Sequence, residues 1–133
     1  MNSVKKSMSE SQSGQNKSYE QYLCEIKEQI SFYEFEGTDD EQTVEEICRI
    51  IADVMMSPDG KPYKIKNAIV TAAVVKQKFA ELNLSNIWHV LEKYSKITYR
   101  INDVPAYVTA MLYNSVTETE LRLINEVNVG LNQ

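Results

Sequence analysis

Apolar residues recur along much of this chain at the three- and four-residue spacing of helices that bury one face. The clearest case obeys the rule i, i+3, i+4, i+7 at Val44, Ile47, Cys48, Ile51, Val54 and Met55. Asp39 or Asp40 can cap the start of this helix, because an aspartate oxygen accepts from the free N–H groups of a first turn. Pro58 and Gly60 end it, since proline cannot continue a helix and glycine turns freely.

The same periodicity predicts helices on both sides of that segment. One covers about residues 18–30, and another covers about residues 71–82. Ser85 is a good cap for the helix that follows. Because the connection between these last two helices is short, we expect them to be antiparallel neighbours.

The C-terminal region divides into two predicted helices. Asn102 or Asp103 caps the first, and Pro105 falls in its first turn, where the missing N–H has little effect. Thr117–Glu120 matches a capping box, a reciprocal arrangement of side chains found at helix starts. We therefore expect a separate last helix that begins at this box and ends near Gly130.

One short stretch has a different period. Tyr63 and Ile65 alternate with lysines, Lys66 and Asn67 can make a two-residue turn, and residues 68–70 can pair back. A two-stranded hairpin is marginally stable alone, so it must pack against helices. The predicted fold class is all-α (mainly α), with five or six helices around one core and at most one small β-hairpin near residues 63–70.

The periodic faces also predict the core. Its expected members are Val44, Ile47, Ile51, Val75, Phe79, Ile87, Leu91, Tyr107, Val108 and Met111. Further side chains expected to be buried beside them are Phe32, Tyr33, Phe35, Val74 and Leu82.

Size and composition are those of one globular domain with a tail. The chain has 133 residues, of which 43% are apolar and 25% charged. Residues 1–17 are polar and lack periodicity, so we predict a disordered tail or linker before a single domain over residues 18–133. No apolar run approaches the roughly 20 residues of a membrane span, and no secretory signal is indicated. Together with two cysteines that suggest no disulfide framework, these features predict a cytoplasmic protein without membrane contact.

Charge is unevenly distributed along the chain. The net charge is −5, yet residues 18–60 hold twelve acids and two bases, whereas residues 61–100 hold eight bases and two acids. Such asymmetry can mark an interaction face. The alternative is that the acidic helices pack beside the basic ones, and the sequence leaves both interpretations open.

Candidate catalytic and metal-binding residues are few. His89, the only histidine, has no Cys or Asp at the spacing of metal ligands, so we expect a surface or half-buried helix residue. Cys48 lies on an apolar face with no base indicated nearby. Asp39 and Asp40 are typical of solvated charge near a helix start, and the scattered glycines form no phosphate loop. We therefore predict no catalytic residue, no metal site and no cofactor.

The basic stretch contains the candidate contact residues. Its cations suit phosphate groups, and its tyrosine rings suit stacking on bases. The candidates are Lys76, Lys93, Lys96, Arg100 and Tyr107, with Tyr94 and Tyr99 as further rings. The alternative is that the rings complete the core and the lysines are merely solvated. Because the domain is acidic overall, direct DNA binding is the weaker hypothesis.

Two long motifs carry a resemblance to a known family. They are VVKQKFAELNLSNIWHVLEKY (Val74–Tyr94) and KITYRINDVPAYVTAMLYN (Lys96–Asn114), preceded by IKEQISFYEFE (Ile26–Glu36) and VEEICRIIADVM (Val44–Met55). With them, the segment Tyr22–Thr117 resembles the C-terminal domain of replication initiators of the RepA type, from plasmids and mobile elements of low-GC Gram-positive bacteria. The resemblance includes an uncharacterised domain family of clostridial initiator-like proteins.

The resemblance implies an all-helical domain similar to the C-terminal domain of the primosome protein DnaD. In RepA-type initiators a linker joins this domain to an origin-binding winged-helix domain, and the domain is associated with contacts to the host replication machinery, primase in particular. DnaD-like domains also touch single-stranded DNA through a Tyr-x-x-x-Ile-type motif, and Tyr107 and Met111 stand at that spacing here. Because no winged-helix domain is indicated, we expect either an isolated domain or a short relative that acts with a separate origin binder.

The expected function is that of a non-enzymatic accessory or interaction domain in plasmid or mobile-element replication initiation. Its expected partner is a host replication protein such as primase, or a separate initiator. The alternative is weak binding of single-stranded DNA by the basic stretch of residues 61–100 and Tyr107. Self-association of the chain is left open, because no heptad or exposed apolar stripe recognised in the sequence determines the order of an assembly.

Overall fold

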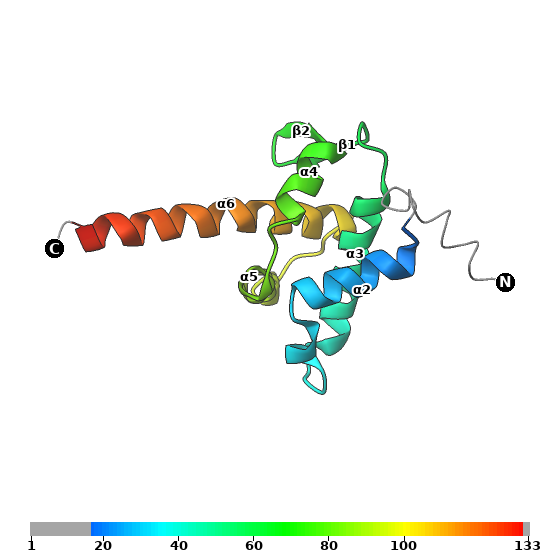
Figure 1. Ribbon diagram of the computed structural model, residues 1–133, viewed down its shortest axis with the longest axis horizontal. Helices are drawn as coiled ribbons and strands as arrows, with labels where there is room; N and C mark the ends of the chain where they lie inside the picture. Colours follow the sequence, from blue (N-terminus) through cyan, green and yellow to red (C-terminus); the bar gives the residue numbers. More distant parts are fainter. Residues whose placement is uncertain (1–16, 132–133) are drawn as a thin grey trace, which may run out of the picture.

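The computed structural model describes residues 17–131, which form five α-helices, a short 3-10 helix and a two-stranded antiparallel hairpin (Figure 1). In chain order the elements are α2 (Tyr19–Gln29), η2 (Phe32–Phe35), α3 (Glu41–Met56), β1 (Pro62–Ile65), β2 (Ala68–Thr71), α4 (Ala72–Phe79), α5 (Leu84–Ser95) and α6 (Val104–Leu131). The predicted mainly helical fold with one small hairpin is confirmed. The expected tail lies, except for Lys17, outside the described residues.

The helices α2 and α3 pack along each other and begin in different ways. Ser18 caps α2 with a capping box, in which its hydroxyl accepts from the N–H of Gln21 at 3.1 Å. Asp40 occupies the cap position of α3, but its side chain makes no cap hydrogen bond. Its backbone is already helical, whereas a capping side chain needs the extended conformation. The predicted aspartate side-chain cap is therefore wrong.

The hairpin forms where the alternating pattern predicts it. Ile65 pairs with Ala68, so Lys66 and Asn67 make the two-residue turn. Lys66 adopts a left-handed φ of 58°, which is a less common conformation for a residue with a Cβ. Ile65 is buried and β1 contacts α6, so the hairpin is supported by a helix as expected.

The helix α6 is the longest element and has two different halves. Its first half packs among α3, α4, α5 and β1 and buries Val108, Leu112 and Val116. Its C-terminal part, residues 121–131, is exposed along its whole length and extends away from the other described elements (Figure 1). The elements before α6 therefore form the body of the domain, and α6 both crosses this body and projects from it.

The separate last helix predicted from Thr117–Glu120 is wrong, because α6 runs through this segment without a break. The capping-box side chains are used in other contacts. Thr117 Oγ1 accepts from Lys78 Nζ at 3.0 Å, and Glu118 binds side chains of α5. Tertiary partners thus replace the local cap, and the backbone continues as a helix past Gly130.

The helices α4 and α5 are not the predicted antiparallel pair. Each of them packs on α6, and Figure 1 shows them on different sides of it. The cap of α5 also differs from expectation, since Asn83 rather than Ser85 starts this helix. Asn83 Oδ1 accepts from the N–H of Ser85 at 2.9 Å, and Asn86 Oδ1 accepts from the N–H of Asn83 at 2.9 Å.

Most of the predicted core is buried. The buried members are Val44, Ile47, Ile51, Val75, Phe79, Ile87 and Val108, whereas Leu91, Tyr107 and Met111 are half-buried. Phe32, Phe35 and Leu82 are buried as expected.

Two expected core residues are exposed instead. Tyr33 is 68% exposed because Phe32 and Phe35, three residues apart, share the inward face of the 3-10 helix. Phe35 then packs against Trp88 of α5, with ring centroids 4.7 Å apart. Val74 is 38% exposed because its neighbour Val75 takes the inward position of α4.

Truncation of Phe79 tests the core. The side chain is 1% exposed, so Phe79→Ala is expected to leave a cavity and lower the free energy of unfolding by on the order of 3–5 kcal/mol. Urea unfolding at neutral pH measures this loss. Val74→Ala is the control and should cost less than about 1 kcal/mol, because its side chain already contacts water. Equal stabilities of the two variants would contradict the packing described here.

Candidate binding sites

The candidate contact residues of the basic stretch do not share one environment. Three of the four cations already have a carboxylate partner within the domain: Lys76–Asp59 at 2.9 Å, Lys93–Glu118 at 3.3 Å and Lys96–Glu92 at 3.5 Å. Such exposed pairs contribute little stability. A phosphate group would nevertheless have to compete with a carboxylate at each of these lysines.

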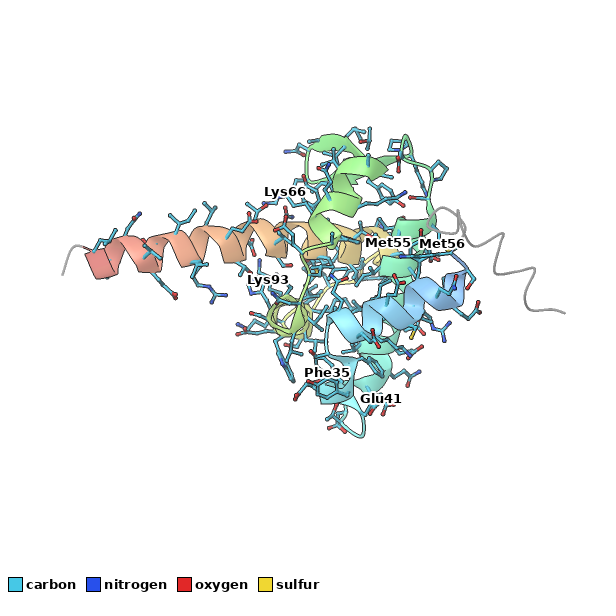
Figure 2. The ribbon with its side chains drawn as sticks, viewed as in Figure 1. Phe35, Glu41, Met55, Met56, Lys66 and Lys93 are labelled. Carbon is cyan, nitrogen blue, oxygen red and sulfur yellow. The ribbon has the colours of Figure 1, made fainter. Side chains whose placement is uncertain are left out.

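The remaining two candidates, Arg100 and Tyr107, lie together. They line a groove of about 400 Å³ between the hairpin and the start of α6. We call this the hairpin groove, and its cationic and aromatic lining consists of Lys64, Lys66, Tyr99, Arg100 and Tyr107. Figure 2 shows Lys66 and Lys93 on elements at different sides of α6, so the basic stretch is not one continuous surface.

The cations of the hairpin groove differ from the other lysines of the basic stretch in their ion pairing. No carboxylate within residues 17–131 lies at ion-pair distance from Lys64, Lys66 or Arg100. The acid in the groove lining, Asp103, caps α6 instead, and its Oδ1 accepts from the N–H of Ala106 at 3.1 Å. Either Asn102 or Asp103 was expected in this role, and it is Asp103 that makes the cap.

Two tyrosines of the groove are joined through their hydroxyl groups. The oxygens of Tyr99 and Tyr107 are 2.8 Å apart. This hydrogen bond raises the pKa of Tyr107, and burial raises it further. The Tyr107 ring therefore stays neutral at physiological pH, and both rings border a surface that carries positive charge.

A larger cleft lies between α3, α5 and the first turns of α6. We call it the α3–α5–α6 cleft, and its volume is about 690 Å³. Its apolar lining is made by Ile47, Ile50, Val90, Leu91, Val104, Pro105 and Val108, with the rings of Tyr19 and Tyr94. Clefts of this volume that are lined mainly by apolar side chains are typical of binding sites.

The rim of the α3–α5–α6 cleft is acidic. Asp39, Glu46 and Asp53 line it, and in the described part of the chain none of them has a cation at ion-pair distance. The cation of the rim, Arg49, is held by Glu45 at 3.0 Å. The cleft therefore places unpaired negative charge beside an apolar floor.

The sequence analysis missed parts of both sites. Lys64 and Lys66 were counted as basic residues, but only the hairpin brings them beside Arg100. Glu46 and Asp53 are seven residues apart, two helical turns, and this spacing could have indicated that they lie on one face of α3.

Cys48 and His89, whose side chains could act in catalysis or bind a metal, are engaged within the fold. Burial raises the pKa of the Cys48 thiol to about 12, so it stays protonated and is a poor nucleophile. His89 Nε2 lies 2.8 Å from Glu118 Oε1. Residues 17–131 contain no group of three or more side chains placed to hold a metal ion. In the same residues, no helix combines the length and apolarity needed to cross a membrane.

Comparisons with models of protein families, with curated proteins and with solved structures give no match. The resemblance to RepA-type initiators stays a prediction.

Glu118 provides a test of the contact between α5 and α6. Burial alone would raise its pKa, but hydrogen bonds from His89 and Lys93 outweigh burial and lower it. A carboxylate with a lowered pKa stabilises the fold above the unfolded-state pKa, and this contribution is lost as the pH falls through the folded-state pKa. Glu118→Gln should therefore lower the free energy of unfolding at neutral pH, by up to about 1 kcal/mol because the groups are partly exposed.

Urea unfolding at neutral and at acidic pH measures this effect, and the difference between Glu118→Gln and the unmodified protein should vanish in acid. Glu92→Gln is the matched control, since Glu92 forms an exposed pair with Lys96, four residues later at the C-terminal cap of α5. A difference that persists at low pH would show that lost packing, and not charge, causes the change.

Proposed function

We propose that this domain is a non-catalytic interaction domain and that a partner protein inserts a cationic, apolar segment into the α3–α5–α6 cleft. The observation that carries the proposal is the apolar floor beside the unpaired carboxylates of Asp39, Glu46 and Asp53. Apolar anchors of the partner would cover the floor, and its Lys or Arg side chains would pair with the rim. Neither contribution requires a chemical reaction.

The spacing of the carboxylates favours an elongated ligand. Glu46 and Asp53 both lie on α3, and seven residues of α-helix span roughly 10 Å. A segment of a partner protein that lies along α3 can reach both carboxylates. A helix with cations two turns apart fits this arrangement, and so does an extended strand with cations three residues apart.

The resemblance to RepA-type initiators supports a partner from the replication machinery. We propose that the partner is a host replication protein, primase first, or a separate origin-binding initiator. The domain would then act as an accessory domain in plasmid or mobile-element replication initiation. Such a role needs a protein-binding surface, and the apolar floor and acidic rim of the α3–α5–α6 cleft support this proposal.

Charge reversal at the cleft rim tests this function. Glu46→Lys combined with Asp53→Lys should weaken binding to the primase of the host bacterium by about tenfold or more, because two attractive charges become repulsive. Biolayer interferometry with immobilised primase measures the affinity. Glu34→Lys combined with Glu36→Lys is the control, since it makes the same change of net charge at exposed residues outside the cleft.

An equal loss in both double variants would show a non-specific effect of net charge and contradict the assignment of the cleft. If the unmodified protein bound neither primase nor a separate origin-binding initiator, the proposed partner would be contradicted.

A second candidate function is weak binding of single-stranded DNA in the hairpin groove. It is favoured by three unpaired cations, Lys64, Lys66 and Arg100, beside the rings of Tyr99 and Tyr107. Proteins that bind single strands without sequence preference combine cations along the backbone with rings for base stacking. The groove has both, on an otherwise acidic protein.

Two triple variants separate this groove from the rest of the basic stretch. Lys64→Gln, Lys66→Asn and Arg100→Gln together should weaken binding of a labelled single-stranded oligonucleotide and reduce the salt slope by about 2, at roughly 0.7 for each phosphate contact. Asparagine is chosen at position 66 because it tolerates the left-handed conformation. Fluorescence anisotropy over a salt series provides the measurement.

The control triple variant replaces Lys76, Lys93 and Lys96 by glutamine and should have a smaller effect, because these cations are already paired. If the control lost more affinity than the groove variant, the hairpin groove would not be the DNA-binding site.

A further inference from the structure

The second half of α6 projects from the body with its apolar side chains in water. Every residue from 121 to 131, which we call the projection, is exposed, and Figure 1 shows no other element beside it. The sequence of the projection includes Ile124, Val127, Val129 and Gly130, all residues with low helix propensity. A helix of this composition gains its stability mainly from packing. The projection therefore lacks the contact that would stabilise it.

Four of its apolar side chains form one stripe. Leu123, Ile124, Val127 and Leu131 follow the spacing i, i+1, i+4, i+8 and are 61%, 55%, 54% and 79% exposed. Leu123 lies seven residues, or about two turns, beyond the buried Val116. The apolar stripe thus continues the face with which α6 already packs on its own body.

Charge narrows the choice of partner. The projection contains one cation, Arg122, and one anion, Glu126, so it is neutral. It lacks the rows of Lys or Arg that attract nucleic acid or an anionic membrane surface. A second neutral apolar helix complements it, and another copy of this chain provides one.

We propose that two copies of this protein associate through the apolar stripe, with their projections packed antiparallel and centred on Val127. Leu123 of each copy then lies opposite Leu131 of the other, and Ile124 lies opposite Gly130. Gly130 has no atom within 4 Å of the place of a Cβ, so the body of its own copy does not require a glycine there. A residue without a side chain leaves room for the isoleucine of a partner.

The position of the stripe favours the antiparallel arrangement. Because the stripe continues the buried face of α6, a parallel partner would bring its own body to the place that α4 and α5 occupy. In the antiparallel arrangement the two bodies lie at opposite ends of the helix pair. The resulting interface is isologous, the commonest form among homodimers.

The interface is small. Each stripe side chain adds on the order of 100 Å² of apolar surface, so both copies together bury about 800 Å². Specific interfaces usually bury at least about 1,200 Å², and weaker, transient ones bury less. The proposed dimer is therefore weak and depends on concentration.

Sedimentation velocity of the full chain over a range of micromolar concentrations tests the proposal. The unmodified protein should shift from monomer to dimer as its concentration rises. Leu123→Gln combined with Val127→Gln should stay monomeric at every concentration. Glutamine retains helix propensity, and both side chains are exposed, so the cooperative melt of the body should be unchanged.

Leu121→Gln combined with Val129→Gln is the matched control, because it removes two exposed apolar side chains of the projection that lie outside the stripe. This variant should still form the dimer. The proposal would be overturned if the unmodified protein stayed monomeric at all concentrations. Binding of this monomer to lipid vesicles would likewise overturn it. Equal loss of the dimer in both double variants would overturn the assignment of the stripe.

Disulfide cross-linking tests the antiparallel arrangement in a Cys24→Ser background, which removes the exposed native thiol. Val127→Cys should give a covalent dimer under mild oxidation, because this residue faces its own copy. Leu123→Cys should not, because its counterpart in the antiparallel pair is Leu131. Efficient cross-linking through Leu123→Cys would indicate parallel helices and overturn the arrangement.

Discussion

Burial of one face along the first half of α6 is the constraint on which the rest of the structure depends. Val108, Leu112 and Val116 lie on this face, and α3, α4, α5 and β1 all contact the same helix. The face also contains Ser115, which is fully buried and whose hydroxyl donates to the carbonyl of Leu112 at 2.7 Å. This hydrogen bond satisfies the hydroxyl inside the core, where an unpaired group would be costly. The four contacting elements can therefore pack closely around one helix.

The same helix separates the candidate surfaces. Val104, Pro105 and Val108 line the α3–α5–α6 cleft, whereas Ala106 and Tyr107 line the hairpin groove. The two sites thus lie on different faces of the first turns of α6. The apolar stripe lies at the other end of the helix, so association of two copies would leave the cleft and the groove open.

The charge asymmetry of the chain is explained only in small part by packing. Within the described residues, Lys76–Asp59 is the one ion pair that joins the acidic segment of residues 18–60 to the basic segment of residues 61–100. Other bases of the basic segment pair with Glu118 and Glu120 of α6. Glu46 and Asp53 on one side and Lys64, Lys66 and Arg100 on the other have no ion-pair partner among residues 17–131. The interpretation of the asymmetry as interaction faces is thereby favoured.

Sequence alone was sufficient for the features that depend on local spacing. The buried face of α3, the two-residue turn of the hairpin and a cap for α6 at Asn102 or Asp103 follow from periodicity and from the chemistry of neighbouring residues, and the structure selects Asp103 for the cap. Tertiary structure decided the features that depend on partners far apart in the chain. Thr117–Glu120 has the residues of a helix start, yet Lys78 and His89 engage its side chains from other elements, and α6 continues. Likewise, the sequence does not distinguish the pairing of Lys76 from that of Lys64, and only the fold places Asp59 beside Lys76. Local spacing determines which face a residue occupies, whereas the packing of distant elements determines whether its charge is already neutralised.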